Sequence, residues 1–292
     1  MMIQEHEPEI RLRVDPTNPG QFFACCGLLE ISNQLWGESV GFFSEEGELF
    51  FIKSQELDQN IDIVKLIEAL VGCNITNTMY DMELERLDNL SKMSKKEISK
   101  FPIFEAEKKQ LEEMWRAAPI LLGEPFDLRV DWFLDNRSGG NDFKTWAGQQ
   151  SVLDIASNMK RLVQECNFNR TTPEDLLFWT KNSDSVPFNF DSDLGGVGSD
   201  LDVGFSFDPL KIRVQIRPII EILAFIGLQR FRPSFDEAKK CYKYSIWFNP
   251  LIPEIASVAA CGLLGLKDSK RFEFQLLYRT KYLKSFLPAR QV

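Results

Sequence analysis

Three apolar segments share a pattern of small residues that limits how this chain packs. Residues 24–28, 224–228 and 259–263 each read Ala-x-x-Gly-Leu, and each segment follows a strand-like stretch and a proline-containing turn. Residues three positions apart lie on the same face of a helix, so the alanine and the glycine allow a helix to approach a sheet closely. The pattern therefore predicts buried helices packed behind strands, in a repeated strand-turn-helix order.

Periodicity extends this order along the chain, because alternating apolar residues predict strands and apolar residues three and four apart predict helices. The predicted strands are 9–15, 40–43, 49–52, 126–132, 211–217, 242–248 and 271–282. The predicted helices are 20–36, several within 60–115, 144–165, a short one with Thr172 as its N-cap and Pro173 at its first position, 218–229 and 253–264. The expected fold class is α+β, with antiparallel or mixed sheets that carry helices on one face.

We expect residues 1–292 to form a single large domain. The alternative organisation is a duplicated ferredoxin-like unit, with halves 1–180 and 181–292 and a helical insertion over 60–115. Within that insertion, residues 82–99 are rich in both charge signs and are interpreted as a solvated helix pair or an insertion without a role in the core. Residues 182–209 are polar and rich in glycine and aspartate, and are interpreted as a long loop.

The chain has one histidine, His6, and six cysteines without a CxxC pair. Ser–His, Cys–His and multi-histidine metal sites would all depend on His6, and no P-loop or dinucleotide-binding pattern occurs. We therefore predict a non-enzymatic protein with no catalytic residue, no metal and no cofactor. The cysteines are interpreted as buried reduced thiols. With no signal-type start and no apolar run of about 20 residues, they predict a cytoplasmic protein without membrane contact.

The net charge of −9 conceals an asymmetry along the chain. Residues 211–292 hold 15 Lys/Arg and 6 Asp/Glu, a net charge of +9. Residues 1–210 hold 19 basic and 37 acidic side chains, a net charge of −18. A basic end on an acidic chain is typical of a polyanion partner.

Basic side chains recur on one face of several predicted strands. They are Arg11 and Arg13 in 9–15, Lys211, Arg213 and Arg217 in 211–217, and Arg279 and Lys281 in 271–282. If these strands share one sheet, its open face follows the phosphates of a nucleic acid, and nearby aromatic rings stack on bases. Those rings are Tyr242, Tyr244, Trp247 and Tyr282. The structural alternative is that any half-buried strand turns polar residues outward.

Residues 137–141, Arg-Ser-Gly-Gly-Asn, are a second candidate anion site. Glycines allow the backbone to approach a ligand, and amides before a helix N-terminus favour an anion. Arg137 and Lys144 add positive charge, and Gln149 lies on the following helix. The alternative is a turn without a ligand.

Three strings of sequence resemble a known family. They are NPGQFFACCGLLE at 18–30, DNRSGGNDFKTWAGQQ at 135–150 and RPIIEILAFIGLQRFRP at 217–233. In order and spacing they resemble a CRISPR-associated protein encoded with type I-G (formerly I-U) systems. The resemblance extends from residue 9 to about 285, apart from 80–115 and 182–209.

This resemblance implies a non-catalytic subunit of a type I effector ribonucleoprotein (Cascade) in antiviral defence. It implies an RNA-recognition-motif-like core, the ferredoxin-like RAMP fold, here with helical insertions. The implied partners are CRISPR RNA, target DNA or both, together with other Cas subunits, which the acidic part of the chain would contact. The candidate nucleic-acid-binding residues are Arg11, Arg13, Arg137, Lys144, Gln149, Lys211, Arg213, Arg217, Arg230, Arg232, Arg279 and Lys281.

Two other functions stay open. A protein–protein adaptor without nucleic-acid contact would use the acidic region and the 24 phenylalanines as anchors. A Mg²⁺-dependent nuclease would use the clustered carboxylates Asp191, Asp193, Asp200 and Asp202, although acidic loops are more often simply solvated.

Overall fold

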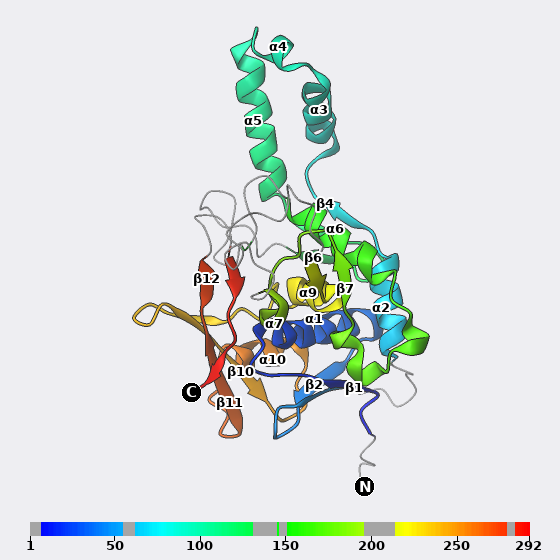
Figure 1. The fold of residues 1–292 in the computed structure, drawn as a ribbon, viewed down its shortest axis with the longest axis vertical. Coiled ribbons are helices and arrows are strands. Elements are labelled where there is room, and N and C mark those ends of the chain that lie inside the picture. The colour runs from blue at the N-terminus through cyan, green and yellow to red at the C-terminus, as the bar shows by residue number, and fades with distance from the viewer. Residues whose placement is uncertain (1–6, 55–61, 131–144, 146–150, 196–213, 279–283) are drawn as a thin grey trace.

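Two apolar helices form the centre of the molecule (Figure 1). The computed structural model describes residues 7–54, 62–130, 145, 151–195, 214–278 and 284–292. The central helices are α1 (Pro19–Trp36) and α9 (Pro218–Gly227). Every residue of α9 is buried, and so is every residue of α1 from Pro19 to Ser32. A helix that is apolar on all sides needs neighbours all round, which explains why the remaining elements surround this pair.

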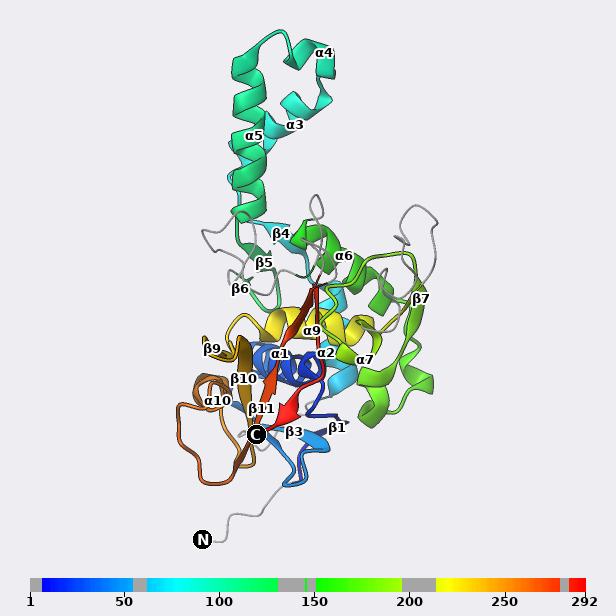
Figure 2. The same ribbon diagram turned by 60° about the vertical axis from the view of Figure 1, so that its left-hand side comes forward.

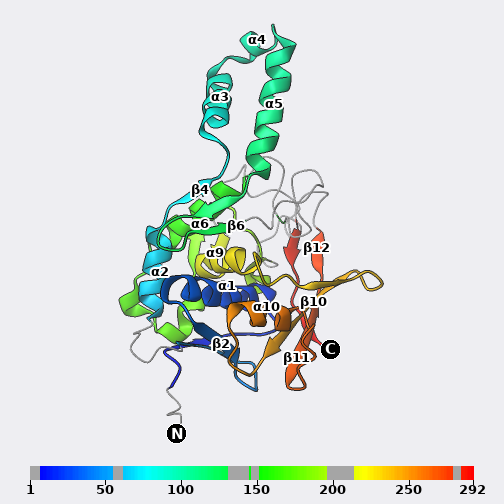
Figure 3. The same cartoon turned by 180° about the vertical axis from the view of Figure 1, so that it is seen from behind.

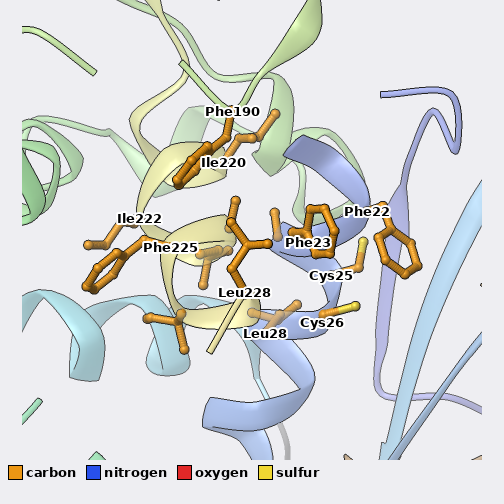
Figure 4. Close-up of a cluster of buried hydrophobic side chains, with 14 of the residues drawn as sticks. Phe22, Phe23, Cys25, Cys26, Leu28, Phe190, Ile220, Ile222, Phe225 and Leu228 are labelled. Carbon is orange, nitrogen blue, oxygen red and sulfur yellow. The ribbon is translucent and has the colours of Figure 1, made fainter. Parts of the chain in front are cut away.

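The two central helices touch backbone to backbone at Gly27 and Gly227. A Cβ atom on Gly27 would lie 2.0 Å from the Leu223 carbonyl oxygen, and one on Gly227 would lie 2.0 Å from that of Phe23. Small residues are therefore required at both positions, but the prediction that they face a sheet is wrong, because each faces the other helix. Around the crossing, side chains of both helices form one apolar cluster (Figure 4).

The third copy of the small-residue pattern has a different role. Its glycine, Gly262, lies beyond the end of α10 (Pro253–Ala260) and has a φ of 75°. This is the left-handed region of backbone space, which glycine adopts without a steric penalty. Gly262 therefore belongs to the turn after α10 rather than to a helix contact.

In the described residues, the strands form five small sheets whose pairings are all antiparallel, so the α+β class is confirmed. The largest has the order β14-β11-β10-β9, with bounds Arg290–Gln291, Ser269–Phe274, Cys241–Trp247 and Ser234–Asp236. A second has the order β1-β3-β2, with bounds Ile10–Arg13, Leu49–Ser54 and Ser39–Phe43. A third has the order β4-β5-β6, with bounds Ile75–Asn77, Ile120–Leu122 and Leu128–Val130. The two-stranded sheets are β7-β8 (Lys181–Ser183 and Val214–Ile216) and β12-β13 (Leu276–Tyr278 and Lys284–Phe286).

Helices predicted from periodicity occur close to their expected places. Besides the central pair and α10, they include α2 (Ile63–Gly72) and α6 (Val152–Val163). Of the predicted helix 144–165, the structure describes α6, which Ser151 caps by accepting a hydrogen bond from Asp154 N at 3.0 Å. Thr172 is an N-cap as predicted, but the segment it starts, η2 (Pro173–Phe178), is a 3₁₀ helix, as is η1 (Phe168–Arg170).

A helical arm extends from one end of the body (Figures 2 and 3). It consists of α3 (Asp81–Lys92), α4 (Lys95–Ile98) and α5 (Pro102–Ala117). Its buried residues Met79, Leu90 and Leu111 form an apolar cluster separate from the main core. The prediction that 82–99 lies outside the core is confirmed, and the arm provides its own small core.

Three aromatic residues proposed to stack on bases lie inside the protein instead. Tyr242, Tyr244 and Trp247 are buried, and the Tyr244 ring stacks on Phe22 with centroids 4.2 Å apart. Trp247 Nε1 donates a hydrogen bond to the Gly41 carbonyl oxygen at 2.7 Å, which satisfies its polar atom. The base-stacking hypothesis for these three residues is wrong, because β10 lies within the core; Tyr282 is outside the described residues.

The six cysteines are free thiols, and all but Cys261 are buried. Burial raises the pKa of the Cys25 and Cys26 thiols far above the usual value, so both keep their protons near neutral pH. The interpretation of the cysteines as core residues without disulfides is confirmed.

Candidate functional site

Residues 188–193, which we call the hub segment, bring together three distant parts of the chain. Asn18 bonds to it from the start of α1, and Glu221 from the first turn of α9. Thr145 Oγ1 donates a hydrogen bond to the Phe188 carbonyl oxygen. One contact comes from each of the strings 18–30, 135–150 and 217–233. Asn18, Thr145 and Glu221 therefore share one structural neighbourhood, and Thr145 is the one described residue of its string.

Asn18 connects the hub segment to α1. Its Oδ1 atom accepts hydrogen bonds from Gly20 N at 3.0 Å and Ser192 N at 3.3 Å, and its Nδ2 donates to Asp191 Oδ1 at 2.6 Å. Asparagine is a favoured N-cap, and proline is favoured at the next position. The same side chain thus starts the helix and fixes residues 191–192.

Arg217, immediately before α9, neutralises the acidic end of the hub segment. Its Nη1 atom lies 3.2 Å from Asp191 Oδ2 and 2.9 Å from Asp193 Oδ2. Burial raises the pKa of the Asp191 carboxyl, and the Arg217 charge and the Asn18 hydrogen bond act against this increase. Asp191 is only 2% exposed, so losing Arg217 would leave its charge buried without an ionic partner.

Glu221 holds the middle of the hub segment. Its Oε1 atom accepts hydrogen bonds from Phe190 N at 3.1 Å and Asp191 N at 3.0 Å. Burial raises the pKa of Glu221 to about 8, although the backbone hydrogen bonds and others oppose the shift. Near neutral pH the side chain is therefore largely a neutral acid, with one oxygen engaged by the two amides.

The N-terminal ends of α1 and α9 are already occupied by side chains of the protein. Helix N-termini attract anions. At α1 the Asn18 side chain is the acceptor, whereas at α9 the cap residue Arg217 directs its own side chain to Asp191 and Asp193. The nuclease hypothesis placed a metal on this acidic segment, but Asp191 and Asp193 share Arg217, while Asp200 and Asp202 are outside the described residues. Within the described residues, no group of three or more His, Cys, Asp or Glu side chains is placed to hold a metal ion.

Two of the predicted nucleic-acid contacts are engaged by buried carboxylates. Arg217 is paired as above, and Arg230 lies 3.1 Å from Glu30 Oε1, whose side chain is 1% exposed. Arg230 also pairs with Glu254 at 3.2 Å. Since moving either arginine onto a phosphate would leave a buried charge uncompensated, both act as structural residues.

Arg11 and Arg13 are more accessible to a phosphate than Arg217 and Arg230. Arg11 Nε lies 3.7 Å from Glu174 Oε1, and Arg13 Nη1 lies 3.2 Å from Asp175 Oδ1, with all four side chains about half exposed. Exposed pairs of this kind contribute little stability, so a phosphate competes with them at low cost. Arg232 is exposed, and its carbonyl oxygen accepts the Cys261 thiol at 2.8 Å.

Among the described residues, the strands that carry the predicted basic faces do not share one sheet. β1 pairs with β3, β8 pairs with β7, and β12 pairs with β13. The condition for a single basic sheet face is therefore not met. The remaining predicted contacts, Arg137, Lys144, Gln149, Lys211, Arg213, Arg279 and Lys281, lie outside the described residues.

Sequence patterns identified some of the hub-segment contacts and missed others. Asn18 before Pro19 is a helix-start signal in the sequence, but it does not show that the same side chain also bonds to Asp191 and Ser192. Glu221 carries a clear signal, because it is the only charged residue in the apolar run 218–229. A lone carboxyl in such a run needs a buried hydrogen-bond partner, but no sequence pattern shows that the partner is the backbone of 190–191.

No family model, curated protein or solved structure matches this chain. The helices of the described ranges include none with the length and apolar character that crossing a membrane requires.

Proposed function

We propose that the chain is a non-catalytic subunit of a type I CRISPR effector ribonucleoprotein that holds guide RNA or target DNA and contacts neighbouring Cas subunits. The observation that supports this best is that the hub segment bonds to Asn18, Thr145 and Glu221, one described residue from each of the three family-like strings. Strings that define a common core are expected to meet in space. In this proposal that core is RNA-recognition-motif-like with helical insertions, which is compatible with small antiparallel sheets and helices.

Several proposed nucleic-acid contacts are close in sequence to residues that bond to the hub segment. Lys144 precedes Thr145, and Lys211 and Arg213 precede β8 and Arg217. The ion pairs of Arg217 and Arg230 with buried carboxylates count against these two residues as primary contacts. The proposal therefore rests first on Arg137, Lys144, Lys211 and Arg213, with the exposed Arg11 and Arg13 as further candidates. Positive charge at these positions would bind phosphates through counterion release.

Charge reversal tests this proposal. The double variant Lys211→Glu/Arg213→Glu is expected to weaken binding of labelled CRISPR RNA at least tenfold. It should also reduce the slope of log K against log salt by about 1.4–1.8, the value for two lost phosphate contacts. Fluorescence anisotropy at several salt concentrations measures both quantities.

A matched control separates local contacts from overall charge. Lys65 and Lys267 are exposed on the body, and Lys65→Glu/Lys267→Glu changes the net charge equally. If both double variants bind RNA like the unmodified protein, the nucleic-acid part of the proposal is wrong.

A protein–protein adaptor is the second candidate, because four of the described candidate arginines form ion pairs within the protein. Pull-down with neighbouring Cas subunits after nuclease treatment distinguishes the two functions. Assembly that is retained without bound RNA supports the adaptor.

A further inference from the structure

The tip of the helical arm carries a cluster of lysines that have no acidic partner among the described residues. Lys92, Lys95, Lys96 and Lys100 are all exposed, and none forms an ion pair with a described residue. Some lysines of the body are paired with carboxylates, as in the 2.6 Å contact between Lys243 and Asp236. We call residues 92–103 the arm tip.

The only carboxylate among residues 92–100 is engaged in starting a helix. Glu97 accepts hydrogen bonds from Ser94 N at 2.8 Å and Ser94 Oγ at 2.6 Å, which completes a capping box at α4. These hydrogen bonds lower the pKa of Glu97, so it stays charged while its oxygens face Ser94. Residues 92–100 therefore carry four positive charges and one negative charge, and the negatively charged Glu97 is held by its hydrogen bonds to Ser94.

The charges of the arm are unevenly distributed, although one exposed carboxylate, Glu105, lies in the first turn of α5 beside the tip. Asp81, Glu83 and Glu85 lie in the first turns of α3, at the end that joins the body (Figure 3). Midway along the arm, Arg86 and Glu107 pair at 2.7 Å. α5 has 16 residues, which corresponds to about 24 Å, so the lysines are held well away from the acidic base.

Apolar side chains are exposed beside these lysines. The Phe101 side chain is 52% exposed and Ile103 is 73% exposed. The Phe101 ring lies 5.3 Å from the Phe104 ring, which packs against the arm's own apolar cluster. Phe101 is thus supported from one side and open on the other, as a stacking platform requires.

We propose that the arm tip binds the phosphate backbone of a nucleic acid, with Phe101 stacking on a base. This site is separate from the residues of the proposed function, and goes beyond it. Lysine ammonium groups are mobile point charges that need no fixed partner geometry, which suits a regular row of phosphates.

The small size of the tip favours a nucleic acid over an acidic protein surface. Stable protein interfaces bury about 800 Å² on each partner, whereas α4 has four residues and only Phe101 and Ile103 are large exposed apolar side chains beside it. Phosphate binding obtains its free energy from counterion release and requires no such area. Each phosphate contact adds roughly 0.7–0.9 to the slope of log K against log salt concentration.

The test uses full-length protein with labelled single-stranded RNA and DNA of mixed sequence. Lys95→Glu/Lys96→Glu is expected to raise Kd at least tenfold and to reduce the salt slope by about 1.4–1.8. The control Lys65→Glu/Lys267→Glu should change Kd less than threefold. Phe101→Ala should raise Kd roughly fivefold or more with an unchanged salt slope.

Crosslinking provides a readout independent of affinity. Ultraviolet crosslinks to the labelled strand should map to peptides within 92–103 in the unmodified protein and disappear in Lys95→Glu/Lys96→Glu. Equal weakening by the tip and control pairs would indicate a general charge effect and overturn the proposal, as would binding by the tip variant at the unmodified level. Loss of binding in Lys211→Glu/Arg213→Glu alone, with the tip variant unaffected, would overturn the arm-tip site and leave the proposed function standing.

Discussion

At the scale of single residues, Glu221 is the most informative side chain. It is buried in the first turn of α9 and accepts two backbone amides through one oxygen. Its second oxygen, Oε2, also lies within hydrogen-bond distance of Phe190 N, at 3.4 Å. Burial raises the pKa of this carboxyl to about 8. A glutamine has the same shape, and its amide oxygen can accept the same two hydrogen bonds. The uncharged glutamine side chain therefore fits this site.

The pH dependence of stability follows from this shift. A carboxyl whose pKa is about 8 in the folded protein and ordinarily 4.5 stabilises the fold fully below pH 4.5 and progressively less as the pH rises through about 8. Compared with the unmodified protein, Glu221→Gln should therefore gain in relative stability between those limits. Urea unfolding from pH 5 to 9 measures the difference.

Two further variants complete this test. Glu221→Ala leaves the Phe190 and Asp191 amides without an acceptor and should lower the free energy of unfolding by at least about 2 kcal/mol. Glu113→Gln, on the exposed surface of the arm, serves as the control. A pH-independent difference between Glu221→Gln and the unmodified protein would show that Glu221 is not held as a neutral acid.

At the scale of elements, the crossing of α1 and α9 determines the core. Both glycines stand where a single extra carbon would meet backbone rather than a movable side chain. Closely packed interiors tolerate added volume poorly. The helix ends reinforce the crossing, because Asn18 and Arg217 attach both N-termini to the hub segment.

Gly27→Ala should therefore lower the free energy of unfolding by roughly 3 kcal/mol or more. Gly72→Ala, in α2 with no atom near the new carbon, should be neutral or stabilise by about 0.5–1 kcal/mol. Adding Gly227→Ala to Gly27→Ala should cost less than Gly227→Ala alone, since the helices are already displaced. Denaturant midpoints and a double-mutant cycle measure these values, and full additivity would contradict a shared contact.

The elements also show how far sequence reasoning extends. Periodicity located α1, α9, β10 and the hairpin of β2 and β3, because their buried faces repeat at regular spacing. It did not find β4 or β5, whose three residues are too few to establish a period. Pairing between distant segments was the larger difficulty: the small-residue pattern required a close neighbour for α1, but nothing local identified that neighbour as α9. For the same reason, no sequence pattern showed which arginines meet buried carboxylates.

At the scale of the whole molecule, the arm is an addition to a complete body. It joins between β4 and β5, which pair as adjacent antiparallel strands. Thr78 N donates to the Pro119 carbonyl oxygen at 2.9 Å, so the two ends of the arm meet directly. Its apolar cluster is separate from the main core.

Replacing residues 79–118 with Asn-Gly should consequently convert the junction into a two-residue hairpin turn. The shortened protein is expected to unfold in one cooperative transition, with a free energy of unfolding within about 1 kcal/mol of the full-length value. Circular dichroism during urea unfolding measures both. Loss of cooperative unfolding would mean that the body depends on the arm.

The contact between α1 and α9 also affects how the chain folds during synthesis. α1 leaves the ribosome roughly 190 residues before α9 is complete, and translation at about 5–20 residues per second makes that interval on the order of 10 s or longer. Throughout that time an apolar helix lacks the neighbour that closes over Gly27. The nascent chain thus passes through a long stage in which a helix that is buried in the finished core is open to chaperones or to other nascent chains.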